Sequence, residues 1–268
     1  IAIEEVFIGQ GPFSRKEMME VFYDQFLGSS KAAKSCKILN EEDINLYFDV
    51  DANTLSASSR NPIIIKNSYL EYDINFDLVD FVVEFRSRSL NHHHMIKSFF
   101  SGTTFYKDIS KKMRADKKRL EAYLGSSTHL MQTIANESWE KEKFVLIVDK
   151  FRVNPKEYFS VSDTLGVKKV KVIKNAVKKS SKSKAVVINI GSDSAKARNP
   201  FNDEKTYFNI LFKGEKQSLV DFLAVEYYVD DNGNYAPFYD VMFGGYIGSL
   251  KAGDMLPSDY FQTIKENH

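Results

Sequence analysis

The sequence contains little of what marks several protein classes. Cysteine occurs once and proline six times in 268 residues, and the longest hydrophobic run covers only residues 144–148. One cysteine excludes an intramolecular disulfide and a thiolate metal centre, and a membrane-spanning helix needs about 20 consecutive apolar residues. Glu4 and Glu5 interrupt any signal peptide at the start of the sequence. These absences predict a protein of the cytoplasm with no membrane span.

Hydrophobic and aromatic residues, by contrast, are abundant. They make up 43% and 13% of the chain, and charged residues make up 27%. This composition can bury a sizeable core and is unlike that of a disordered or collagen-like chain. A length of 268 residues is compatible with one domain or two. We expect a single domain over residues 1–268, with a subdivision near residues 105 and 143 as the alternative.

Two segments give the clearest signals of secondary structure. Ser14 and Glu17 form a capping-box pattern, which predicts a helix that ends at Gly28. Within residues 69–88, apolar and acidic residues alternate, and this predicts a half-buried strand. Val79 is expected on the buried side of that strand, together with Phe81, Val83 and Phe85.

The remaining periodicity predicts the fold class. Helical spacing of apolar residues predicts three helices between residues 90 and 134, and another helix starts near Ser258. Strands mostly follow strands, which indicates an α+β fold with mostly antiparallel or mixed sheet and with helices clustered near the N-terminus and in the middle of the chain. The other predicted strands are residues 1–8, 44–50, 54–58, 63–65, 144–153, 170–172, 185–190, 206–212, 219–229 and 235–243.

Charge is balanced overall and uneven along the chain. There are 37 lysines and arginines and 36 aspartates and glutamates, for a formal net charge of +1. Residues 106–184 carry a net charge of +11, and the stretches before and after them carry −5 each. A basic middle between two acidic ends concerns binding partners rather than the fold.

Three motifs could hold a phosphate or a metal ion, but each lacks part of the site. Gly9 and Gly11 stand between a predicted strand and a predicted helix, but the third glycine of a dinucleotide fingerprint is missing. The three histidines at residues 92–94 cannot all point at one ion, because consecutive side chains diverge. Asp49 and Asp51 could offer two carboxylates to Mg²⁺, but a turn is the simpler interpretation. We therefore expect no metal and no cofactor.

No candidate nucleophile has partners that would activate it. Ser126 and Ser127 lie close to His129 in the sequence, but a catalytic triad is assembled in space and usually places its nucleophile in a strained G-x-S-x-G turn. Gly125 is more simply the end of one helix, followed by the cap of the next. Cys36 has no surroundings that indicate catalysis. We expect a protein that is not an enzyme.

Two acidic stretches, residues 67–85 and 217–250, contain no lysine or arginine. On a strand, alternate acidic residues share one face and could form a ridge of negative charge. Such a ridge can mimic a phosphate backbone and occupy a basic groove on another protein. The alternative is that these residues form ordinary polar faces of half-solvated sheets. The candidate partner-binding residues are Glu71, Asp73, Asp77, Asp80, Glu84, Asp221, Glu226, Asp230, Asp231 and Asp240.

Residues 164–192, in turn, contain no acidic residue. A basic segment of this kind can neutralise phosphates, with an affinity that falls as salt is added. It has no arginine for reading bases and almost no aromatic residue for stacking, so specific nucleic-acid recognition is not expected. Non-specific phosphate contact and a solvated loop are the two interpretations. The candidate phosphate-binding residues are Lys168, Lys169, Lys171, Lys174, Lys178, Lys179, Lys182 and Lys184.

In general character the chain resembles the host-takeover proteins of large tailed bacteriophages. The shared features are its length, its lone cysteine, its 29 lysines against 8 arginines, and acidic sheet-like stretches such as residues 71–84. The resemblance is closest to the kind that inhibits the bacterial RNA degradosome. It implies a non-catalytic homodimer that covers RNA-binding segments of a ribonuclease in the host cytoplasm. The resemblance assigns a role to no individual residue.

The leading hypothesis is therefore a phage-type protein that binds and inhibits a host nucleic-acid-processing machine through acidic surfaces. One alternative is a structural component of a phage particle or another assembly. The second alternative is a non-specific nucleic-acid-binding protein that uses the basic segment.

Overall fold

The computed structural model describes residues 11–110, 114–174 and 207–261, and its contacts divide the chain into two compact units. Unit 1 consists of Ile1–Leu124 with Ser249–Pro257, and unit 2 consists of Gly125–Gly248 with Ser258–His268. The described residues form four α-helices and 15 strands in antiparallel sheets, which confirms the α+β prediction. The first boundary between the units lies between residues 105 and 143. A single domain over the whole chain stays a prediction.

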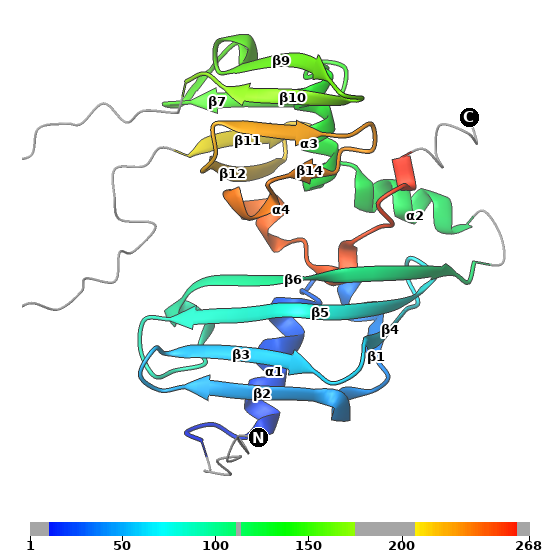
Figure 1. Ribbon diagram of the computed structural model, residues 1–268, viewed down its shortest axis with the longest axis vertical. Helices are drawn as coiled ribbons and strands as arrows, with labels where there is room; N and C mark the ends of the chain where they lie inside the picture. Colours follow the sequence, from blue (N-terminus) through cyan, green and yellow to red (C-terminus); the bar gives the residue numbers. More distant parts are fainter. Residues whose placement is uncertain (1–10, 111–113, 175–206, 262–268) are drawn as a thin grey trace, which may run out of the picture. The chain divides into compact units, whose positions relative to one another are not determined.

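Unit 1 is built on a six-stranded antiparallel sheet (Figure 1). Its elements are α1 (Arg15–Phe26), β1 (Cys36–Ile38), β2 (Ile44–Asp49), β3 (Thr54–Ser59), β4 (Ile63–Asn67), β5 (Tyr72–Phe85), β6 (Met95–Asp108) and α2 (Arg114–Tyr123). The long strand β5 pairs with β6 along one edge. On its other edge β5 pairs first with β4 and then with β3. Strand β1 extends the sheet from β4, and β2 extends it from β3.

Helix α1 covers one face of this sheet. The predicted capping box is present, because the Ser14 backbone N–H donates to the Glu17 carboxylate while the Ser14 hydroxyl accepts from the Glu17 N–H. The rings of Phe22 and Phe26 are fully buried and lie 4.8 Å from Phe81 and 4.9 Å from Phe76, respectively. Burying one such side chain stabilises the fold by about 1.5–3 kcal/mol. We call the covered side the inner face and the opposite side the outer face.

A β-bulge at Val79 sets which residues of β5 point to the outer face. The pairing of β5 with β6 shifts register between Leu78 and Asp80. One extra residue moves every later side chain to the opposite face. The prediction that Val79 is buried is wrong, since Val79 is 70% exposed. Before the bulge the buried residues are Tyr72, Ile74 and Phe76, and after it they are Phe81, Val83 and Phe85.

Strand β6 occupies a segment where helical spacing had predicted a helix. Only His92–His94 forms a helical turn, of the 3-10 type, before the chain enters the ladder with β5. Apolar residues such as Phe99 and Phe100 fit either period, and pairing along the whole of β5 decides in favour of the strand. The two later predicted helices are present as α2 and, in unit 2, α3 (Ser127–Ala135).

Unit 2 is a sandwich of two antiparallel sheets. Its strands are β7 (Phe144–Val148), β8 (Phe151–Arg152), β9 (Phe159–Thr164), β10 (Val167–Val172), β11 (Phe208–Phe212), β12 (Lys216–Phe222), β13 (Glu226–Val229), β14 (Tyr235–Ala236) and β15 (Val241–Gly244), and β15 leads into helix α4 (Gly245–Ser249). One sheet has the order β14-β13-β10-β9, and the other has the order β15-β12-β11-β7-β8. The Phe159 ring packs between them, 5.4 Å from both Phe208 and Phe222.

The predicted strands at residues 219–229 and 235–243 are each divided between the two sheets. The first becomes β12 and β13, and the second becomes β14 and β15. The buried Tyr227 fixes both crossings, because its hydroxyl donates to the Asp240 carbonyl (2.6 Å) and accepts from the Ala224 N–H (2.9 Å). The predicted Asn-Gly hairpin is present between β13 and β14. The predicted strands at residues 1–8 and 185–190 lie outside the described residues.

Candidate functional site

The bulge gathers the first acidic stretch on the outer face of unit 1. Asp73 and Asp77 precede the bulge, and Asp80 and Glu84 follow it. All four alternate with the buried residues of β5. Because the bulge corrects the phase, all four carboxylates point away from α1. The sequence alone placed Glu71, Asp73 and Asp77 on one face, whereas Glu71 precedes the strand.

Lysines from neighbouring strands lie opposite one end of this acidic row and pair with the other end. Asp73 lies opposite Lys66 of β4 and opposite Lys107 of β6, and directly opposed residues share one face of a sheet. At the other end, the Glu84 carboxylate lies 2.8 Å from the Lys97 ammonium group. Glu84 is therefore paired with a lysine, and Asp73 has a lysine at the directly opposed position on each side.

The centre of the row lacks such compensation. Asp77 lies opposite Thr103, and Asp80 lies opposite Ser101. Within the described residues neither carboxylate has a hydrogen bond or an ion pair. The central part of β5 thus presents two carboxylates that face no cation.

Exposed hydrophobic side chains surround these two aspartates. Val79, at the bulge, is 70% exposed, and Phe105, which lies opposite Asn75 on the same face, is 68% exposed. We call Asp77, Val79, Asp80 and Phe105 the outer patch. The outer patch therefore offers a partner both apolar area and unpaired negative charge.

The acidic residues of the second stretch do not form one surface. The Asp230 carboxylate caps the hairpin turn, because it accepts from the N–H groups of Asn232 and Asn234 (2.9 Å each). The Asp231 carbonyl accepts from Gln132 at 2.7 Å, and the Asp240 carbonyl accepts from Tyr227. Asp221 lies on β12 and Glu226 lies on β13, in different sheets. The carboxylate of Asp230 thus has a structural role, whereas the contacts of Asp231 and Asp240 are made by their backbone carbonyls.

The described lysines of the basic segment are largely paired as well. The Lys169 ammonium group lies 2.8 Å from Glu226, which raises the pKa of Lys169 and lowers the pKa of Glu226 through a mutual hydrogen bond. Lys168 lies 2.5 Å from Asp163, and Lys171 is opposite Glu226 in the ladder. Lys174 lies over the Tyr158 ring at 5.1 Å. Lys178, Lys179, Lys182 and Lys184 lie outside the described residues.

The other candidate motifs have structural roles. The Asp49 carboxylate accepts from the N–H groups of Asp51 and Ala52 in the β2–β3 turn, and Ser126 caps α3. Burial raises the pKa of the Cys36 thiol to about 12, so this thiol is protonated at neutral pH and a poor nucleophile. Across the described residues, no group of three or more histidine, cysteine, aspartate or glutamate side chains could hold a metal ion.

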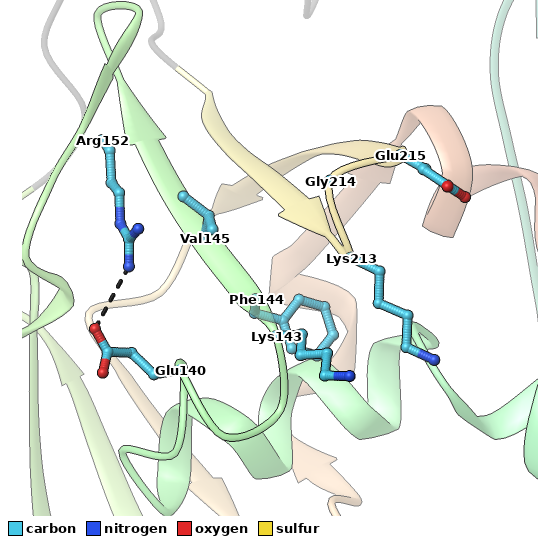
Figure 2. Close-up of a pocket in the computed structure, with 8 residues that line it drawn as sticks. All are labelled: Glu140, Lys143, Phe144, Val145, Arg152, Lys213, Gly214 and Glu215. Carbon is cyan, nitrogen blue, oxygen red and sulfur yellow. Dashed lines mark hydrogen bonds and ion pairs between the residues drawn. The ribbon is translucent and has the colours of Figure 1, made fainter.

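Sequence reasoning missed a hollow of about 630 Å³ in unit 2 (Figure 2). Lys213, in the β11–β12 turn, donates its N–H to the Lys143 carbonyl at 2.9 Å. Figure 2 shows the two lysine side chains extending the same way, while Glu215 points elsewhere and Glu140 pairs with Arg152 at 3.5 Å. Within the described residues no carboxylate pairs with Lys143 or Lys213. This hollow can attract an anion, and no signal in the sequence connects its two distant lysines.

A buried histidine lies behind this hollow. The His129 ring packs 4.9 Å from Phe144 and 5.5 Å from Phe212. Its Nδ1 accepts from the Gly125 N–H at 3.0 Å, and its Nε2 lies 3.2 Å from the Glu142 carboxylate. Burial lowers the pKa of His129, and Glu142 opposes that shift. Both ring nitrogens are engaged, so His129 positions the start of α3 and is not available as a general base.

Comparisons of the chain with protein-family models, with curated proteins and with solved structures gave no match. In the portions that the structure describes, no helix combines the length and the apolar character needed to cross a membrane.

Proposed function

We propose that this protein is a non-enzymatic binding protein whose outer patch docks on a basic segment of a nucleic-acid-binding partner. The observation that carries the proposal is the pair Asp77 and Asp80, which face no cation and lie beside the exposed Val79 and Phe105. A segment that binds nucleic acid is rich in lysine and arginine, so it offers the complementary charge. The apolar side chains supply the buried area that charge alone does not.

The resemblance to host-takeover proteins makes the partner more specific. We propose an RNA-degrading ribonuclease complex of a bacterial host, inhibited in the host cytoplasm by a homodimer of this protein. The outer patch would cover an RNA-binding segment of the ribonuclease, and RNA would compete for that segment.

The test is retention of the partner from a bacterial lysate by the immobilised chain. Replacement of both aspartates (Asp77→Lys with Asp80→Lys) should lower retention of the ribonuclease about tenfold or more, because like charges then meet across the contact. The control variant, Glu42→Lys with Glu121→Lys, makes the same charge change at two exposed positions of unit 1. Equal retention by both variants would contradict the proposal. Self-assembly without capture of a ribonuclease would instead support the structural alternative.

The hollow in unit 2 favours a second candidate function, salt-sensitive binding of nucleic acid. Lys143 and Lys213 lack carboxylate partners within the described residues, whereas Lys168 and Lys169 are paired. If this function is correct, Lys143→Gln with Lys213→Gln weakens RNA retention on a filter. The control pair, Lys171→Gln with Lys174→Gln, leaves it unchanged. No retention at low salt by the unmodified chain excludes this function.

A further inference from the structure

A groove of about 370 Å³ in unit 1 lies between α1 and the connection from β5 to β6. Helix α1 contributes Glu17, Glu20, Val21 and Asp24 to the lining. The groove is on the side of the sheet that α1 covers, so it is separate from the outer patch.

The groove offers accessible hydrocarbon surface. Leu90, from the β5–β6 connection, and Met95, the first residue of β6, line the groove together with Val21 of α1, and all three side chains are only half-buried. Below them the ring of Phe85 is 3% exposed and belongs to the core. An apolar side chain placed here would gain about 25 cal/mol for each Å² removed from water.

One wall of the groove is acidic. Glu17, Glu20 and Asp24 are all exposed, and their spacing places them on one face of α1 over about 10 Å of helix. Glu17 accepts from Ser14, and Asp24 accepts from the Gln25 amide at 2.6 Å. Within the described residues the Glu20 carboxylate has no hydrogen bond or ion pair. No lysine or arginine lines the groove, and the ionisable residue among the lining side chains from the facing connection is His92.

We propose that this groove binds a peptide segment of another protein in which an apolar side chain is flanked by lysine or arginine. The apolar side chain would lie among Val21, Leu90 and Met95, and the flanking cations would lie along the acidic wall. The first ten residues of the chain carry Glu4 and Glu5 and no lysine or arginine, so their charge disfavours them as the occupant. This site does not depend on the outer patch, and unit 1 would therefore present two surfaces to basic partners.

The experiment measures fluorescence anisotropy of labelled peptides with the full chain at about 50 mM salt, where charge contributes strongly. The probe is a decapeptide of alternating lysine and leucine, and the comparison peptide has serine in place of leucine. We expect the lysine–leucine peptide to bind at least about tenfold more tightly, which corresponds to about 1.4 kcal/mol. Glu20→Lys should weaken its binding about tenfold, and Glu20→Gln should weaken it less. Glu42→Lys, with the same net charge as Glu20→Lys, should change binding less than about twofold.

Several results would overturn the proposal. Equal binding of the two peptides would show a general attraction of cations, and so would equal losses in Glu20→Lys and Glu42→Lys. Self-association that Glu20→Lys abolishes, without peptide binding, would show that a second copy of the chain occupies the groove. The outer-patch variant (Asp77→Lys with Asp80→Lys) should no longer retain the ribonuclease, but it should bind the peptide more tightly than Glu20→Lys does. Failure of one proposal is therefore distinguishable from failure of the other.

Discussion

The acidic residues of the two units have different surroundings. In unit 1, β5 carries four carboxylates on the outer face, and the central pair, Asp77 and Asp80, faces no cation. In unit 2, Asp230 caps a turn and Glu226 pairs with Lys169. Two stretches that look alike in the sequence thus give an acidic row on one strand in unit 1, and in unit 2 acidic residues that are spread over two sheets and a turn.

The difference shows that charge along the chain does not predict charge on the surface. Asp73 lies directly opposite Lys66 and Lys107, which belong to the strands on either side of β5. Lys169 of the basic middle forms an ion pair with Glu226 of the acidic end, on the neighbouring strand. Neighbouring strands bring residues of the basic and acidic blocks together, so much of their charge is balanced within the sheets. The charged residues that face no opposite charge are the candidates for binding a partner.

The bulge in β5 places Asp77 and Asp80 on the same face of the sheet. Its presence can be tested by comparing two substitutions, and this comparison has the largest expected effect. Val83→Asp places a carboxylate in the core, since Val83 is fully buried, and should destabilise the protein by more than about 4 kcal/mol. Val79→Asp, at a position 70% exposed, should change stability by less than about 0.5 kcal/mol. Urea unfolding followed by circular dichroism measures both. Comparable losses would mean that Val79 faces the core and that no bulge exists.

The ion pair between the buried Arg119 and Asp108, whose side chain is 50% exposed, gives the next effect. Arg119 is 5% exposed and donates to Asp108 (2.6 and 2.9 Å) and to the carbonyls of Leu70 (2.9 Å) and Glu71 (3.0 Å). Arg119→Met leaves the carbonyls of Leu70 and Glu71 without their donor and should cost about 1–3 kcal/mol in the free energy of unfolding. A loss below about 1 kcal/mol would indicate that the pair is solvated and contributes as surface ion pairs do.

The same pair predicts a dependence of stability on pH. The Arg119 hydrogen bond lowers the pKa of Asp108 far below its usual value. The stabilisation is therefore complete above the unfolded pKa of about 3.9 and is lost as the pH falls towards the folded pKa. Unfolding curves between about pH 5 and pH 2 should show this loss in the unmodified chain and a smaller loss in Asp108→Asn. Identical slopes in both proteins would contradict the assignment.

The exposed ion pair of unit 2 gives the smallest effect. The side chains of Lys169 and Glu226 are 32% and 37% exposed. Lys169→Gln should change the free energy of unfolding less than Arg119→Met does, because solvent screens an exposed ion pair, and added salt should reduce the difference further. A cost as large as that of Arg119→Met would show that the exposed ion pair stabilises unit 2 as strongly as the Arg119–Asp108 pair stabilises unit 1.

Local signals in the sequence predicted the local parts of the fold. The capping box at Ser14 and Glu17 predicted α1, and the Asn-Gly turn after Asp231 predicted the β13–β14 hairpin. The division of residues 219–229 between two sheets escaped prediction, because a continuous apolar pattern does not show where a strand leaves its sheet. The bulge at Val79 could not be predicted either. Apolar and polar residues alternate on both sides of it, and the pattern does not show that the buried face changes from one set of alternate positions to the other.

The candidate surfaces could be predicted only in part. Asp77 and Asp80 were among the predicted partner-binding residues, but the lysines that face their neighbours come from strands whose pairing the sequence does not specify. The lysine hollow in unit 2 combines Lys143 and Lys213, which are distant in the sequence and meet through one backbone hydrogen bond. The α1 groove joins a helix face to a connection that had been predicted as helical.

Carboxylate footprinting tests the central account most directly. The intact protein is treated briefly with a water-soluble carbodiimide and an amine, and the labelled residues are quantified by peptide mass spectrometry. We expect Asp77 and Asp80 to react faster than Glu84 and Asp230, which are held by Lys97 and by the hairpin turn. The bound ribonuclease should slow the reaction of Asp77 and Asp80 selectively. Slower labelling of these two aspartates than of Glu84 in the free protein would contradict the account.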